Sequence, residues 1–213
     1  TLSAPRPSVL PAAAPGSLEV AVAALRAGGI VAVPTETLYG LAVLPQVEPL
    51  AAVLAAKRRS TDKGIALAVD SIAQVEVLAE VPPAARRLAE RFWPGPLTLV
   101  LPPRAGGLGN LPDALLGPSG ALGFRLPDHP VPRHLAGRLG PLALTSANVS
   151  GEPDARTVAE VSAAFGHALA LVLDGGPVRG GIASTVAAVS ADGAVIILRA
   201  GALDPADVLA ALD

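Results

Sequence analysis

The sequence predicts a single domain of the α/β class. Short apolar segments of strand length alternate with longer segments that carry apolar residues at helical spacing, which is the pattern of α/β proteins. The 213 residues suit one domain. Only residues 1–16 and 103–120 are rich enough in Pro or Gly to resemble linkers, and no internal repeat is present. We therefore expect one folded unit over residues 17–213.

Boundary signals mark the first elements. Ser17 can cap a helix with one apolar face, which stops at Gly28-Gly29. A buried strand follows over residues 30–33, and Pro34 ends it. The other elements expected in the first half are a helix over 49–59, a strand over 65–69, helices over 71–80 and 82–93, and a strand over 97–101.

The second half opens with a long Gly- and Pro-rich loop over residues 103–120. Thr157 and Glu160 form the pattern of a capping box, and Asp204-Pro205 supplies an N-cap with Pro at the first helical position. The remaining elements expected are a strand over 121–126, a helix over 130–139, and strands over 142–145, 169–173, 184–189 and 195–198.

Composition excludes several classes of function. There are no cysteines, which excludes disulfides, thiolate metal sites and thiol nucleophiles. The net charge of −2 argues against broad adhesion to nucleic acid, so anion binding must come from local clusters of Lys and Arg. Mean hydropathy is +0.53, but Pro or Gly interrupts every apolar run well before the roughly 20 residues that a membrane helix needs.

The first 16 residues contain four prolines and no continuous apolar core. This composition is a poor signal peptide and is typical of a disordered leader. We expect residues 1–16 to be disordered, the protein to be cytoplasmic, and no membrane to be involved.

The first candidate site is the segment PTETLYG at residues 34–40, directly after a hydrophobic strand. Ligands tend to bind α/β proteins at such positions. Hydroxyl groups and one carboxylate suit a small polar substrate such as an amino acid. A cluster of hydrogen bonds within a turn is the alternative.

The second candidate is the basic segment KRRSTDKG at residues 57–64. Lys57 falls on the core-facing stripe of its helix, so its ammonium group must reach solvent or meet an anion. Four cations in seven residues suit a polyphosphate. The alternative is that cations at a helix C-terminus only complement the helix dipole.

Two further segments place small polar residues or glycines after a strand. In TSANVSG (145–151), hydroxyl and amide groups can bind phosphate oxygens and a metal ion, although neither a P-loop nor a nucleophile elbow is present. In DGGPVRGGIAST (174–185), four glycines permit close approach to a ligand or form a flexible hairpin.

Two arginines lie in or beside apolar strands. Arg125 and Arg199 each need an internal carboxylate or a ligand anion as a partner. The histidines His129, His134 and His167 show no metal-ligand spacing, and we expect them to be structural.

Together, these segments resemble the YrdC-like threonylcarbamoyl-AMP synthase family over residues 17–201. The blocks that carry the resemblance are PTETLYGL (34–41), KRRSTDKG (57–64), FWPGPLTLVLP (92–102), FRLPDHP (124–130), TSANVSG (145–151), and LDGG with IASTV (173–176 and 182–186). The resemblance implies a twisted, open, mixed sheet with flanking helices and a positively charged cleft. It also implies an enzyme that converts L-threonine, bicarbonate or CO2, and ATP into threonylcarbamoyl adenylate and pyrophosphate.

The resemblance also assigns roles to individual residues. Those implied for L-threonine are Thr35, Arg125, Thr145 and Ser184. Those implied for ATP are Lys57, Arg59, Lys63, Ser146, Asn148 and Arg199. Lys57 and Arg59 are the expected catalytic pair, acting by positioning and by neutralising charge, and no side chain is assigned directly to metal.

Further expectations concern the cofactor and partners. Mg²⁺ is expected to accompany ATP, and the product is expected to pass to a tRNA-modifying threonylcarbamoyltransferase complex that acts on adenosine 37. We also expect a weak contact with tRNA or double-stranded RNA. Many relatives have Pro in place of Thr145 and Ala200, which affects the detailed geometry expected at the pocket wall and at the turn after Arg199.

Two rival functions remain open from the sequence. One is a double-stranded RNA-binding or ribosome-assembly module, which the net charge of −2 and the five aromatic residues disfavour. The other is a carbamoyl-adenylate-forming domain like those of hydrogenase-maturation carbamoyltransferases, which normally accompany zinc-finger cysteines that this chain lacks.

Overall fold

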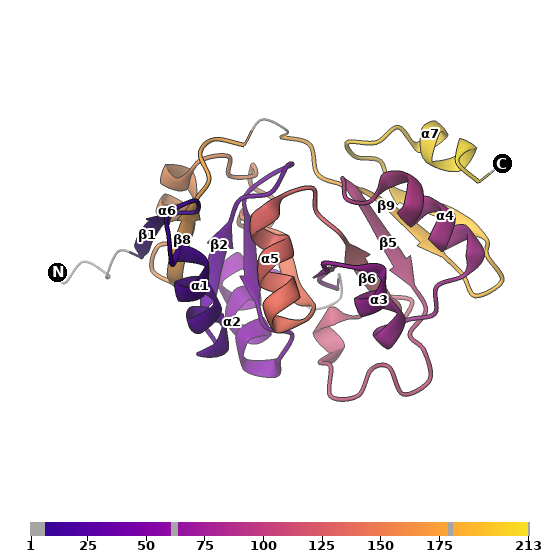
Figure 1. The fold of residues 1–213 in the computed structure, drawn as a ribbon, viewed down its shortest axis with the longest axis horizontal. Coiled ribbons are helices and arrows are strands. Elements are labelled where there is room, and N and C mark those ends of the chain that lie inside the picture. The colour runs from indigo at the N-terminus through magenta and orange to yellow at the C-terminus, as the bar shows by residue number, and fades with distance from the viewer. Residues whose placement is uncertain (1–6, 61–63, 179–180, 213) are drawn as a thin grey trace.

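The computed structural model describes residues 7–60, 64–178 and 181–212. Within these residues, ten strands form one open sheet (Figure 1). Their order across the sheet is β1 (Ser8–Pro11), β8 (Leu169–Asp174), β2 (Ile30–Val33), β3 (Gly40–Val43), β7 (Leu142–Ser146), β4 (Leu67–Ala68), β6 (Leu122–Arg125), β5 (Leu97–Leu101), β9 (Thr185–Val189) and β10 (Val195–Arg199).

The strand directions are mixed. The pairs β1–β8, β2–β8, β4–β6 and β5–β9 are parallel, whereas β2–β3, β3–β7, β4–β7, β5–β6 and β9–β10 are antiparallel. The expectation of an α/β domain built on an open, mixed sheet is confirmed.

One face of the sheet carries the larger hydrophobic core. The register places Leu41, Leu67, Leu99 and Phe124 on this face because paired residues project to the same side. The helices that contribute to this core are α2 (Val47–Lys57), α3 (Ile72–Leu78), α4 (Pro83–Phe92), α6 (Val158–Phe165) and α7 (Pro205–Ala210).

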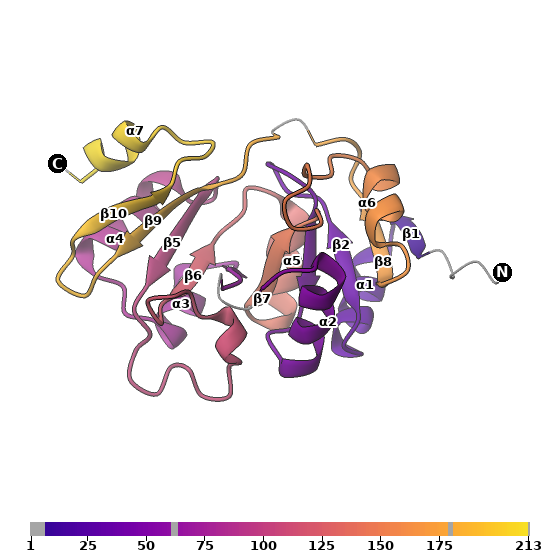
Figure 2. The same ribbon diagram turned by 180° about the vertical axis from the view of Figure 1, so that it is seen from behind.

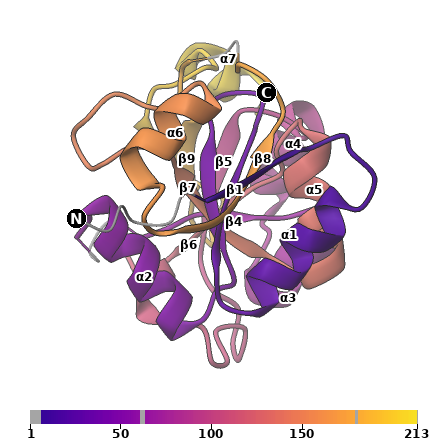
Figure 3. The same cartoon turned by 90° about the vertical axis from the view of Figure 1, so that its left-hand side faces the viewer.

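The opposite face is covered only in part. Helices α1 (Ser17–Arg26) and α5 (Pro130–Leu139) pack against Val31, Val33, Ala42 and Leu142, near the β8 side of the sheet. Viewed from that side, α1 and α5 lie on one side of the strands and α2 and α6 on the other (Figure 3). Seen from behind, β5, β9 and β10 lie in front of α4, without a described helix over them (Figure 2). This half of the face is therefore left for the cavity described below.

Several boundary predictions are confirmed. Helix α5 has the predicted bounds, and Thr157 and Glu160 form a complete capping box at the start of α6. The side chain of Asp204 caps α7 by accepting a hydrogen bond from the Ala206 amide. Gly28 adopts a φ of +82°, as a residue at a helix C-terminus often does.

Other predictions are corrected by the structure. Ser17 does not cap α1; Gly16 holds that position and Ser17 is a buried first residue of the helix. Helix α2 begins two residues before the predicted 49–59, and it ends two residues early because Arg58 adopts a left-handed φ of 50°. Strand β4 has only two residues, and the loop over 103–120 contains a 3₁₀ turn, η2 (Asp113–Leu115).

The expectation of a disordered leader is wrong for residues 8–11. They form β1, which pairs in parallel with β8, and Leu10 packs beside the core under α1. The sheet edge tolerates Pro11 because an edge strand needs fewer donors. The folded unit thus begins at least nine residues before Ser17. Strand β3 was not predicted as a strand, because its four residues directly follow the polar PTETLY segment.

We expect loss of the α6 cap to lower stability. Thr157→Ala removes the oxygen that accepts from the Glu160 amide, a bond of 3.2 Å. Such substitutions lower the free energy of unfolding by about 0.5–2 kcal/mol. Urea denaturation should show the loss for Thr157→Ala and a much smaller one for Thr157→Ser, which keeps the oxygen. Equal losses for both variants would contradict the role of the cap.

Candidate functional site

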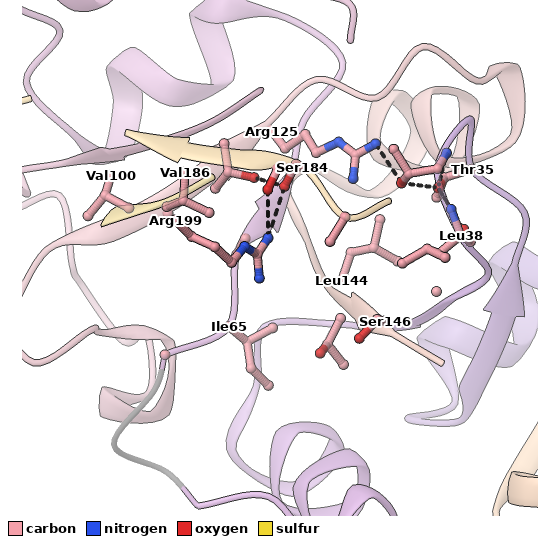
Figure 4. Close-up of a pocket in the computed structure, with 18 of the residues that line it drawn as sticks. Thr35, Leu38, Ile65, Val100, Arg125, Leu144, Ser146, Ser184, Val186 and Arg199 are labelled. Carbon is pink, nitrogen blue, oxygen red and sulfur yellow. Dashed lines mark hydrogen bonds between the residues drawn. The ribbon is translucent and has the colours of Figure 1, made fainter. Parts of the chain in front are cut away.

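A cavity of about 240 Å³ lies on the open half of the sheet face (Figure 4). Its floor consists of side chains from the paired strands β7, β6, β5 and β9, which the register places on one face. The β2–β3 turn, the segment that follows α2, the loop over 115–121 and the segment before β9 form the rim. The wall combines apolar groups such as Val100 and Val186 with three arginines, Arg59, Arg125 and Arg199.

Arg125 is held at one end of the cavity by the β2–β3 turn. Its Nη2 donates to the Glu36 carboxylate and to Thr37 Oγ1, the latter at 3.1 Å. The second carboxylate oxygen of Glu36 is buried and has no hydrogen-bond partner in the described part of the chain. The internal carboxylate, one of the two alternative partners expected for Arg125, is therefore present, and it leaves the guanidinium facing the cavity (Figure 4).

Thr35 organises this turn from within. Its hydroxyl donates to the Leu38 carbonyl at 2.6 Å and accepts from the amides of Thr37 and Leu38. One hydroxyl has one hydrogen and two lone pairs, so these bonds use its full capacity. Both alternatives for PTETLYG thus apply: the segment lines the cavity, and it is a hydrogen-bonded turn.

Arg199 is anchored by Ser184 on another part of the cavity wall. Its Nη2 donates to the Ser184 carbonyl at 2.8 Å, and Ser184 Oγ lies 2.8 Å from Thr98 Oγ1. Burial lowers the pKa of the Arg199 guanidinium below its ordinary value; Asp154 opposes this shift and Arg125 adds to it. Two guanidinium groups that face one cavity and repel each other favour an anion between them.

The basic segment contributes to the third side. Arg59 lines the cavity, and its Nη2 donates to the Gly64 carbonyl at 2.7 Å. Lys63 lies outside the described residues, so its predicted role in ATP binding stays a prediction.

Lys57 takes a different position. It is 1% exposed, does not line the cavity, and donates from Nζ to the carbonyls of Ser146 and Asn148 and to Asn148 Oδ1. Burial lowers its pKa to about 8; the Arg59 charge adds to the shift and Asp154 opposes it. Ser146 lines the cavity, and its hydroxyl donates to Asn148 Oδ1 at 2.6 Å.

Tyr39 fixes the segment that follows β8. Its buried hydroxyl donates to the Gly176 carbonyl at 2.8 Å and accepts from the Gly175 amide at 3.2 Å. Burial raises its pKa; the bond from Gly175 opposes the shift and Asp174 adds to it. The Gly181 amide donates to the Thr37 carbonyl, which attaches the same segment to the β2–β3 turn.

Most predicted site residues meet in this cavity. Those on its wall are Thr35, Arg59, Arg125, Thr145, Ser146, Ser184 and Arg199. Lys57 and Asn148 lie behind the wall, bonded to each other. Sequence reasoning missed Thr37 and Thr98, although both lie in blocks that it singled out. Alternation along the strand LTLVL could have placed Thr98 beside Arg125.

The described residues contain no group of three or more His, Asp or Glu side chains that could hold a metal ion. His129 caps α5 by accepting from the Val131 amide at 3.2 Å, and burial lowers its pKa. This capping contact agrees with the structural role expected for His129.

Comparison with known proteins identifies the family. A family model for Sua5, YciO and YrdC proteins, described as telomere recombination, matches residues 23–201. The chain belongs to the Sua5/YciO/YrdC family. No helix in the described part of this family member is long and apolar enough to cross a membrane.

Curated relatives of this Sua5/YciO/YrdC chain carry the name threonylcarbamoyl-AMP synthase. The protein from Pyrococcus abyssi is 36% identical over 189 residues, which span 87% of this chain and 54% of that protein. The one from Rattus norvegicus is 40% identical over 194 residues, which span 87% and 67% of the two chains. The chain thus spans about half the length of its Pyrococcus relative.

Solved structures of the family share the fold. P. abyssi Sua5 in complex with L-threonine superposes with a TM-score of 0.83 at 34% identity, over 91% of this chain and 56% of that one. Escherichia coli YciO gives a TM-score of 0.78 at 22% identity, over 88% and 90% of the two chains, and supports the fold alone.

We expect the Tyr39 hydroxyl to stabilise the segment after β8. Tyr39→Phe leaves the Gly175 amide and the Gly176 carbonyl without this partner, and an unpaired buried group costs about 1–3 kcal/mol. Hydrogen exchange at the Gly175 amide should accelerate, and the free energy of unfolding should fall. Unchanged exchange at Gly175 would show that the bond contributes little.

Proposed function

We propose that this chain synthesises threonylcarbamoyl adenylate from L-threonine, bicarbonate or CO2, and ATP, with release of pyrophosphate. The observation that carries the proposal is the cavity with arginines on three sides and hydroxyl groups between them. Support also comes from family membership and from relatives that carry the name of this enzyme. The bond that gives the product would form between two anionic reactants, which is why a cationic cavity is needed.

The arginines on the cavity wall would bind different anions. Arg125 would bind the carboxylate of L-threonine, because Glu36 and Thr37 hold one edge of its guanidinium and the group still faces the cavity. A relative solved with L-threonine supports an amino-acid substrate. The hydroxyl of Ser184 is the candidate for contacts to the rest of the amino acid, and Thr35 would act by shaping the turn. Thr145 pairs with Leu41 of the core face, so the register directs its hydroxyl away from the side that Leu144 and Ser146 share and does not favour the direct contact predicted for it.

Arg59, Arg199 and Ser146 would bind the phosphates. All three lie on the cavity wall. Ligand cavities for drug-sized molecules measure about 300–1,000 Å³. A nucleotide and an amino acid together would therefore extend beyond the 240 Å³ described here. Lys63, from the segment beside Arg59, is the proposed further phosphate contact.

The reaction needs positioning rather than a covalent enzyme intermediate. The neutral amine of L-threonine adds to CO2 and loses a proton, which gives a carbamate. A carbamate oxygen then attacks the α-phosphorus of ATP, and the bond to the β-phosphate oxygen breaks as pyrophosphate leaves. Arginines that face both anions reduce their mutual repulsion and the charge that develops on the leaving group.

Magnesium fits this site as a companion of ATP. Mg²⁺ prefers oxygen ligands and keeps several waters when phosphates supply the rest. The described residues offer the Ser146 hydroxyl beside the cavity and no carboxylate cluster, so phosphate oxygens would provide most of the ligands. When bound, the ion would neutralise phosphate charge.

The product would be passed on for modification of tRNA. We propose that a threonylcarbamoyltransferase complex accepts it and acts on adenosine 37, because an acyl-phosphate-like adenylate hydrolyses readily and must be consumed promptly. A weak contact with tRNA or double-stranded RNA belongs to the same proposal.

Incorporation of labelled bicarbonate into an adenylate tests the reaction. We expect label in an AMP-containing product with L-threonine and ATP, much less with L-serine, and none without an amino acid. Incorporation that requires carbamoyl phosphate instead would favour a carbamoyl-adenylate-forming activity. RNA binding that ignores L-threonine and ATP, with no product, would favour an RNA-binding module.

Arg125→Met should raise the KM for L-threonine. Loss of a hydrogen bond to a charged group costs about 1.5–3 kcal/mol, which corresponds to roughly a 10- to 150-fold loss in kcat/KM for L-threonine. The KM for ATP should change far less. Arg133→Met, an exposed position on α5 away from the cavity, is the matched control. Equal effects on both substrates would contradict the assignment of this end to L-threonine.

A further inference from the structure

The side chain of Lys57 bonds to a loop behind the cavity wall and does not line the cavity. It is the last residue of α2, it is fully buried, and its three N–H donors meet three oxygens of residues Ser146 and Asn148. An ammonium group has three donors and no acceptor, so these contacts use its whole capacity. None of these three acceptors is a carboxylate.

The contacted loop, residues 146–150, begins at Ser146, which is the last residue of β7 and lines the cavity. Its backbone is attached to α2 a second time, because the Ser150 amide donates to the Lys57 carbonyl at 2.9 Å. The Ala147 amide donates to the Tyr39 carbonyl at 2.8 Å. Asn148 receives a bond from Ser146 Oγ and donates to the Glu152 carbonyl. Lys57 thus contributes the charged group at the centre of a network that determines where Ser146 points.

The direction of the two carbonyl groups has an electrostatic consequence. Those of Ser146 and Asn148 turn toward the buried ammonium group. Without a cation there, two buried carbonyl groups would lack this partner, which is costly, or would rotate toward other donors. Carbonyl oxygens that turned into the cavity would repel the phosphates proposed to bind there.

We propose that Lys57 is a positioning residue: its ammonium group holds loop 146–150 from behind, so that the Ser146 hydroxyl faces the cavity, and it does not touch the substrate. The inference rests on the proposed function only for its kinetic consequence. It replaces the direct contact between Lys57 and the triphosphate that the sequence suggested.

Hydrogen exchange of the ligand-free protein tests the structural part without any assay of activity. Lys57→Met should accelerate exchange at the Ser150 and Ala147 amides, on the order of tenfold or more, because the loop loses its charged anchor. Val53→Ala, a buried position on the same face of α2, is the control and should leave these two amides less affected. Equal acceleration in both variants would overturn the inference.

NMR titration of the wild-type Lys57 side chain needs no variant to fold. The amine should titrate near pH 8 without ligand, in surroundings that include Arg59 and Asp154. Saturating Mg²⁺ and inorganic tripolyphosphate should raise this midpoint only slightly, because an anion bound to Arg59 offsets the lowering by Arg59 without touching Lys57. Direct contact with the added anion would raise it by about one to three pH units and would overturn the inference.

A double-mutant cycle separates the kinetic roles. If Lys57 acts through Ser146, the variant with both Lys57→Met and Ser146→Ala should be about as slow in kcat as the slower single variant. Independent losses that multiply would indicate that Lys57 acts on the substrate itself. Failure of the wild-type protein to form the adenylate would contradict the proposed function, whereas the exchange and titration results would still decide the position of Lys57.

Discussion

The open half of one sheet face determines everything else about the site. The register brings Leu144 and Ser146 of β7, Arg125 of β6 and Thr98 of β5 to the same side of the sheet. Helices α1 and α5 cover that side only near β8, β2, β3 and β7. Because alternate residues of a strand face opposite sides, one set of residues builds the core under α4 while its neighbours in sequence build the cavity.

Hydrogen bonds within the protein then fix the polar groups around this space. Thr35 satisfies the β2–β3 turn, Tyr39 holds the glycines after β8, and Lys57 holds the loop after β7. All three belong to segments that look like ligand-binding motifs. Lys57 acts from behind the cavity wall, whereas Thr35 and Tyr39 lie on the wall with hydroxyl groups that are already bonded to the protein. Pre-organisation of this kind lowers the cost of ordering the site when a ligand binds.

The sequence predicts the helices of this fold better than its strands. Helix ends carry local signals, such as the Thr157–Glu160 capping box, that need no knowledge of the rest of the chain. Strand β1 has no such signal: Ser8–Pro11 is a strand only because β8, some 160 residues later, offers a free edge. Strand β3 is likewise defined by its two neighbours, and its four residues give too short a pattern to recognise.

The same distinction applies to the site. Recurrent blocks identify which residues gather at the cavity, and seven of the predicted residues line it. The blocks do not indicate which polar group is already satisfied. Lys57 and Ser146 are 89 residues apart, and their contact depends on how α2 packs beside β7. Position in a motif therefore predicts membership of the site, whereas the role depends on tertiary partners.

The chemistry of the cations explains why arginines face the cavity while the lysine of α2 does not. A guanidinium has five N–H donors in a rigid fork, so it can bond to the protein along one edge and still present donors to an anion. Arg125 and Arg199 each use Nη2 for contacts to the protein and remain on the cavity wall. An ammonium group with three protein acceptors has no such reserve. A buried lysine can therefore set the shape of an anion site, whereas arginines are better suited to form the contacts within it.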